Sequence, residues 1–172
     1  MLFLMANGPM QTTAAFAKVG TGTSIKTMMQ VKPILPCRIV EWGFSFDGYT
    51  AATPLQVELI ESGVVNATVT AYAAADITSV DSDALAFVAN SGSVTSSFIS
   101  VGTNASGYTS SAEGSIVSVR NLAGPQLAPP TGPFIEQFPL GREPVLQAGN
   151  FTRIRVTAPS GVNMYSYLVL AF

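Results

Sequence analysis

The stretch CRIVEWGFSFD, Cys37–Asp47, decides the fold of this chain. It holds the only tryptophan, and a phenylalanine follows at each of the next two alternate positions. A β-strand sends successive side chains to opposite faces. The pattern therefore predicts one face with Val40, Trp42, Phe44 and Phe46, and another with Ile39, Gly43 and Ser45. We expect a strand whose aromatic face lies in a hydrophobic core.

Similar short runs, separated by glycine and proline, fill most of the remaining chain. Asp47-Gly48 supplies turn residues, and the alternating run Leu55–Glu61 follows Pro54. Further strands are expected at Ser24–Lys32, Asn66–Tyr72, Glu113–Ala123, Phe134–Leu140, Glu143–Leu146, Phe151–Ala158 and Val162–Phe172. The proline-rich run Gly124–Pro133 is expected to be a loop. About eight strands with almost no helical period predict an all-β fold, an antiparallel β-sandwich of jelly-roll-like type.

The N-terminal region lacks a sustained period. Residues 8–22 are small and polar, so we expect residues 1–23 to form an extended arm and residues 24–172 a single sandwich domain. Met1–Met5 has no basic region before its apolar residues and does not resemble a secretory signal. Met5 is a second plausible start, so the first four residues are expected to be an extension of the native protein.

The composition is apolar and poor in charge. Charged residues make up 10% of the 172 residues and hydrophobic residues 48%, and the mean hydropathy is +0.39. No run approaches the roughly 18 apolar residues that span a membrane. Either the protein hides surface in an assembly, or serine and threonine replace charges on a solvent face. The last run, Val162–Phe172, is apolar on both faces, which favours burial between its sheet and a partner.

The inventory of reactive residues is small. The chain has no histidine, the commonest general base, and a single cysteine, Cys37, which we expect to be a buried core residue. Net charge is −2 without a basic run, which argues against nucleic-acid binding. Asp76, Asp81 and Asp83 lack the full pattern of a calcium loop, so no metal or cofactor is expected. Paired carboxylates of a glycosidase remain the enzymatic alternative, with Glu41, Glu58, Glu61, Glu113, Glu136 and Glu143 as candidates.

Several long blocks are similar to a known family. The segments Val40–Leu59, Gly102–Ile116 and Pro129–Pro159, the last followed by Gly161–Tyr165, resemble small virion structural proteins of tailed phages, particularly those of actinobacteria. The resemblance covers most of Leu35–Leu170 and departs most at Ala73–Ser100. It implies a non-enzymatic head decoration (cement) or minor capsid protein, made in the host bacterial cytoplasm. Such a protein sits as a trimer on the outer capsid surface and binds the major capsid protein.

This role suggests where contacts lie. For capsid or subunit contact we name Met10, Phe16, Val19, Arg142 and Glu143. Arg142 and Glu143 follow Gly141 and precede Pro144, so a rigid turn presents opposite charges, either to a neighbouring subunit or as a local surface ion pair. The alternative function is a tail or fibre module that binds host glycans. It requires an exposed aromatic platform near Tyr49, Tyr72 or Tyr108.

Overall fold

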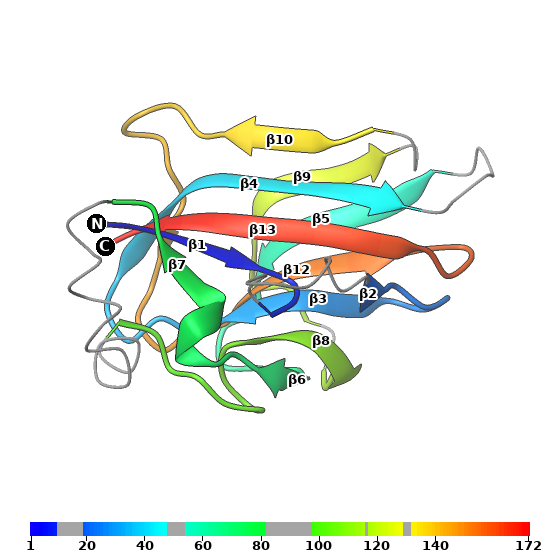
Figure 1. The fold of residues 1–172 in the computed structure, drawn as a ribbon, viewed down its shortest axis with the longest axis horizontal. Coiled ribbons are helices and arrows are strands. Elements are labelled where there is room, and N and C mark those ends of the chain that lie inside the picture. Colours follow the sequence, from blue (N-terminus) through cyan, green and yellow to red (C-terminus); the bar gives the residue numbers. More distant parts are fainter. Residues whose placement is uncertain (10–18, 48–53, 82–97, 116, 129–131) are drawn as a thin grey trace.

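Two antiparallel β-sheets pack face to face and contain almost all of the regular secondary structure of the described chain (Figure 1). The computed structural model describes residues 1–9, 19–47, 54–81, 98–115, 117–128 and 132–172. Within these ranges the only named helix is a single 3-10 turn, η1 (Ala74–Asp76). The expected all-β class and antiparallel two-sheet architecture are confirmed.

Sheet A has seven strands and lies toward the viewer in Figure 1. Its order is β10 (Phe134–Gln137), β4 (Cys37–Asp47), β13 (Asn163–Ala171), β1 (Leu2–Ala6) and β7 (Ile77–Ser79); in addition β11 (Val145–Leu146) pairs with β4 and β2 (Val19–Gly20) with β13. Strand β4 has the bounds predicted for it from the sequence. It lies inside the sheet, between β10 and β13.

Sheet B has six strands. Its order is β6 (Thr68–Ala71), β8 (Gly107–Ala112), β3 (Lys26–Val31), β12 (Thr152–Thr157), β5 (Leu55–Glu61) and β9 (Arg120–Ala128). One set of long-range pairings is nested: β3 pairs with β12, β4 with β10 and β11, β5 with β9, and β6 with β8. The pairings of β4 with β13, β5 with β12 and β3 with β8 cross this set. The first half of the chain therefore folds back on the second half strand by strand.

The core between the sheets contains the aromatic residues of β4. Trp42 and Phe44 are almost fully buried, and Phe134 from β10 packs on both, with ring centroids 5.2 and 4.9 Å away. The indole Nε1 of Trp42 donates a hydrogen bond to the Glu136 carboxylate at 2.8 Å. This aromatic cluster bears out the expectation that Trp42 and Phe44 belong to the core.

The predicted faces of β4 hold only beyond Val40. The register to β13 shifts there, since Val169 lies opposite Glu41 and Leu170 opposite Ile39. Val40 is thus an extra residue in a β-bulge, which reverses the alternation on its N-terminal side. Ile39 and Cys37 point into the core together with Trp42, and Val40 does not share their face. A similar register shift in β3 buries the neighbouring residues Met28 and Met29. It places Thr27 on the outer face of sheet B, where its hydroxyl donates to the Glu113 carboxylate.

The N-terminal residues are not all an arm. Leu2–Ala6 forms β1 in the interior of sheet A, between β13 and β7, with Phe3 and Met5 in the core. The first residues were expected to lie outside the fold, but the long neighbouring strand β13 offers five of them a complete backbone ladder. Residues 10–18 lie outside the described residues, so an arm there remains a prediction.

Two further predictions need correction. The expected count of about eight strands compares with thirteen named segments in the described ranges, several of them too short to show a period. The run after Gly124 is a strand as far as Ala128, not a loop. Pro125 is tolerated there because β9 ends sheet B, where a missing backbone donor leaves no partner unpaired.

Candidate functional site: the outer face of sheet A

The outer face of sheet A is apolar and carries few charges. Alternation along each strand sends Phe3, Met5, Met164, Leu168 and Leu170 into the core and their neighbours outward. The outward set consists of Leu2, Leu4 and Ala6 on β1, Tyr165, Tyr167, Val169 and Ala171 on β13, Gly43 and Ser45 on β4, and Ile135 and Gln137 on β10. These residues form one surface across four neighbouring strands, exposed on β10 and half-buried on β1 and β13, with no other described strand over it. All of β1, β13, β4 and β10 face the viewer in Figure 1.

Among the described strand residues of sheet A that face outward, only three carry a charge. Glu41 lies in the middle of β4, while Arg38 and Asp47 lie near its two ends. The phenolic hydroxyl of Tyr167 donates to Glu41 Oε1 at 2.6 Å. Burial, together with this hydrogen bond and the negative charge of Glu41, raises the pKa of Tyr167, so the hydroxyl stays a donor. The central carboxylate is therefore already solvated by its own chain.

Gly43 allows this arrangement. A β-carbon at position 43 would come within 2.6 Å of the Tyr167 ring and 2.8 Å of the Phe134 carbonyl oxygen. The absent side chain lets the Tyr167 ring lie across β4, beside the Tyr165 ring at a centroid distance of 5.9 Å. The result is a pair of half-buried tyrosines on the outer face. The sequence showed their spacing in Val162–Phe172, but not that they face outward together.

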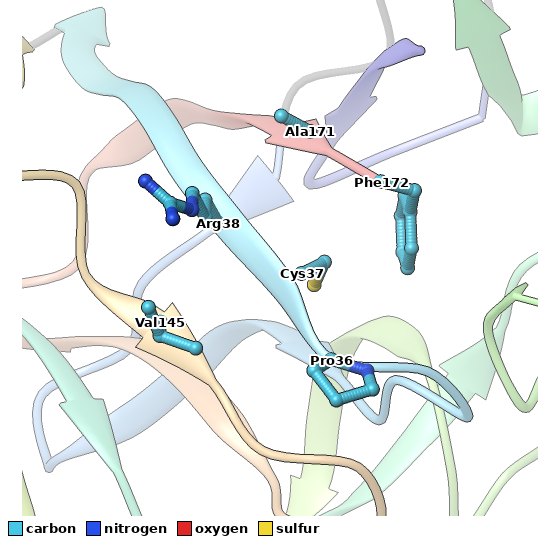
Figure 2. A pocket seen from close by; sticks show the side chains of 6 residues that line it. All are labelled: Pro36, Cys37, Arg38, Val145, Ala171 and Phe172. Atoms are coloured by element: carbon cyan, nitrogen blue, oxygen red, sulfur yellow. The ribbon is translucent and has the colours of Figure 1, made fainter. Parts of the chain in front are cut away.

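A shallow pocket of about 410 Å³ lies at one end of the sheet. Figure 2 shows Pro36 just before β4 and Cys37 and Arg38 at its start, with Val145 on one side and Ala171 and Phe172 on the other. Arg38 pairs with both Val145 and Ala171, so these three residues lie on the outer face. Cys37 is 3% exposed, and burial raises the pKa of its thiol to about 12, as expected for a core cysteine. The pocket has no described nucleophile in reactive form.

Of the residues predicted for subunit contact, the described ones do not form one site, because Val19 lies at one end of sheet A and Glu143 at the other. Met10 and Phe16 lie outside the described residues, and Val19 is a core residue on β2 paired with Met164. Arg142 is exposed. The carboxylate of Glu143 binds Arg38 Nη1 at 3.3 Å and accepts a hydrogen bond from the Gly141 amide at 2.7 Å.

The pKa of Glu143 is accordingly lowered, chiefly by its own backbone amide and, against an opposing effect of burial, also by the Gly141 amide and Arg38. The turn forms a local ion pair, but with Arg38 instead of Arg142.

The tyrosines named for glycan binding and the aspartates considered for calcium binding have partners within the fold where the structure describes them. Tyr72 is 3% exposed and donates to the Ala6 carbonyl oxygen at 2.6 Å, so it does not form a ligand platform. Tyr108 packs on Tyr72, and Tyr49 lies outside the described residues. Asp81 accepts a hydrogen bond from the Leu2 amide and Asp76 one from the Ala73 amide. Asp83 lies outside the described residues, and the described ones contain no cluster able to hold a metal ion.

The six glutamates considered for paired-carboxylate chemistry are each engaged with their own chain. The partners of Glu41, Glu136 and Glu143 are described above. Glu58 binds Arg155, Glu61 binds Arg120 and Asn150, and Glu113 binds Thr27, Ser110 and Arg153. The six glutamates are distributed over both sheets and the loops beside them. They explain the glutamates as parts of the fold.

The outer face of sheet B differs from that of sheet A because the chain covers it. Arg153 points outward from β12 but is fully buried, and it donates to the carbonyl oxygens of Val65 and Glu113. Gln30, also fully buried, bridges the backbone of Ala67 and Ala105. Loops therefore lie over sheet B, while among the described residues the strands of sheet A present an apolar face without such a cover.

Comparisons with protein-family models, with curated proteins and with solved structures found no match for this chain. In the described part of the chain, no helix is long and apolar enough to cross a membrane. The function must therefore be argued from the outer face of sheet A and from the sequence.

Proposed function

We propose that this protein is a non-enzymatic virion structural protein of a tailed phage, a decoration or cement protein. It stabilises the outer capsid surface by binding the major capsid protein as a homotrimer. The observation that carries the proposal is the open outer face of sheet A. A face of apolar and aromatic side chains, whose central carboxylate accepts a hydrogen bond from Tyr167, has the composition of a protein interface core.

The size of this face suits a substantial part of a protein contact. Neighbouring strands are about 4.8 Å apart and a residue advances about 3.4 Å, so the 5, 9, 11 and 4 residues of β1, β13, β4 and β10 cover about 470 Å². A standard protein interface buries about 800 Å² on each partner. The face can therefore supply more than half of one side of such an interface.

The nested strand pairing supports a jelly-roll-like sandwich, in which successive strands from the two halves of the chain pair from the outside inward. The engagement of all six candidate glutamates supports a non-enzymatic role. The resemblance of Pro129–Pro159 to phage virion proteins supplies the phage context.

The test is binding to capsid shells assembled from the major capsid protein alone. Leu4→Lys places a charge in the middle of the outer face, opposite Val169 and Thr78. We expect it to weaken co-sedimentation with shells at least tenfold, as for a central interface residue. The matched control is Val64→Lys, because Val64 is 81% exposed and lies outside both sheets. Equal binding by a folded Leu4→Lys protein, or no binding by the native chain, would contradict the proposal.

A second candidate is a glycan-binding tail or fibre module, and the Tyr165–Tyr167 pair favours it. Two neighbouring tyrosine rings beside a fixed carboxylate are able to stack on a sugar and accept its hydroxyl hydrogen bonds. Titration with a panel of cell-wall saccharides tests it. Saturable binding that Tyr165→Ala abolishes would support this function, and no binding by the native chain would eliminate it.

A further inference from the structure

The pocket at the start of β4 contains an arginine with one unoccupied edge. Arg38 lies on the outer face of sheet A, and its side chain is 55% exposed. Among the described residues, its only side-chain partner is the Glu143 carboxylate, which Nη1 binds at 3.3 Å. The Nε and Nη2 groups, which share one edge of the guanidinium, have no partner there. Two parallel N–H donors on one edge bind a carboxylate strongly, so this edge is an open carboxylate site.

Glu143 holds the Arg38 guanidinium in place. The side chain of Glu143 is 7% exposed, and its carboxylate also accepts a hydrogen bond from the Gly141 amide at 2.7 Å. Directly after this residue, the Pro144 carbonyl oxygen accepts a hydrogen bond at 3.0 Å from the Ile39 amide, which follows Arg38 in β4. The two segments are therefore fixed to each other. A donor edge that is positioned before the ligand arrives lowers the entropic cost of binding.

The other residues that line the pocket are apolar or nearly so. Figure 2 shows Val145 on one side of β4 and Ala171 and Phe172 on the other, with Pro36 and the buried Cys37 between them. The volume of about 410 Å³ lies at the small end of the range for ligand pockets, roughly 300–1,000 Å³. It suits a bulky apolar side chain better than a large ligand. An apolar hollow beside an open arginine edge fits a carboxylate with an apolar group next to it.

We propose that this pocket anchors a peptide segment of the partner protein: an aspartate or glutamate of the partner binds the open edge of Arg38, and a neighbouring apolar side chain fills the space between Val145 and Phe172. The inference rests on the proposed function and names what the outer face of sheet A recognises in the major capsid protein. Arg38, Val145 and Ala171 lie on that face, so the anchor is continuous with the proposed interface. A paired charge fixes the register of a contact that is otherwise apolar.

A small probe tests the pocket without the partner. N-acetylphenylalanine carries an apolar ring and a carboxylate, and N-acetylphenylalaninamide carries the same ring without the charge. In an NMR titration of the native chain, the acid should shift the Arg38 Nε–H and Ala171 methyl signals saturably, and the amide should bind about fivefold more weakly or worse. Arg38→Lys keeps the positive charge but loses the paired donors, so it should also weaken binding of the acid. No saturable binding of the acid, or equal binding of acid and amide, would overturn the proposal.

Co-sedimentation with capsid shells separates this inference from the proposed function. Arg38→Lys should weaken shell binding about fivefold or more, whereas Arg142→Lys, the matched change at an exposed arginine outside the pocket, should not. Ala171→Leu fills the pocket, leaves Arg38 in place and should also weaken binding; Ala112→Leu, at an exposed position of sheet B, is its control. Native-like shell binding by both pocket variants would overturn the inference and leave the proposed function standing. Binding of the acid probe without shell binding by the native chain would support the carboxylate site and contradict the capsid as its partner.

Discussion

Replacing Trp42 with alanine should destabilise the fold and leave the binding surface intact. The side chain is fully buried, packs on Phe44 and Phe134, and donates to Glu136 at 2.8 Å. Truncation of a large core aromatic costs about 3–5 kcal/mol. The loss of the Glu136 hydrogen bond contributes about 1 kcal/mol of this. For a chain of this length, we expect the melting temperature to fall by about 10–15 °C.

The assay is thermal and guanidinium denaturation followed by far-ultraviolet circular dichroism, because the variant lacks the only tryptophan. Trp42→Phe is the matched variant. It keeps an aromatic ring and loses the hydrogen bond to Glu136, so its cost should be closer to about 1–2 kcal/mol. Well below its melting temperature, the Trp42→Ala protein should bind shells normally. Native-like stability together with lost partner binding would refute the assignment of Trp42 to the core.

Three other perturbations test particular contacts. Gly43→Ala should cost about 1–3 kcal/mol, because the added carbon would lie 2.6 Å from the Tyr167 ring; a melting temperature equal to that of the native chain would contradict the close approach. Glu113→Ala should cost about 3–5 kcal/mol by urea denaturation, since it leaves the fully buried Arg153 without its carboxylate. Asp76→Ala removes a half-buried carboxylate that accepts the nearby Ala73 amide in a local turn, so it should cost less. Cys37 should resist a thiol reagent at pH 8 until the protein unfolds. Rapid labelling of the native protein would contradict the burial of this thiol. Because the pKa of the Cys37 thiol is raised to about 12 in the folded state, the protonated thiol contributes its full stability below the unfolded pKa of about 9. This contribution is lost as the pH rises toward 12.

Much of the fold could be predicted because local patterns specify it. The strands Cys37–Asp47 and Leu55–Glu61 have their predicted bounds, since each has a clear period of two and a proline or turn residue before or after it. The antiparallel two-sheet class followed from many short runs without helical period. The faces of β4 and β3 could not be predicted throughout, because a single bulge at Val40 or Met28 reverses the alternation and leaves no mark in the sequence.

The sequence predicted that the protein has an apolar surface to bury, but it did not predict which face of the fold carries that surface. Low charge and a last strand apolar on both faces indicated a buried surface, and the structure places that strand in the middle of sheet A with an open outer face. The individual residues named for contact did not identify this face. Val19 lies in the core and Glu143 binds Arg38, which is 105 residues away in the chain.

The sequence by itself determined the class of fold, the aromatic core strand, the buried thiol and the shortage of reactive side chains, because each depends on residue type and local spacing. Only the tertiary structure decided that Leu2–Ala6 lies inside a sheet, that a bulge at Val40 reverses the faces of β4, and that loops cover the outer face of sheet B. These features depend on which distant segments pair. That choice is made by the sum of many weak contacts between residues far apart in the chain, and no local pattern records it.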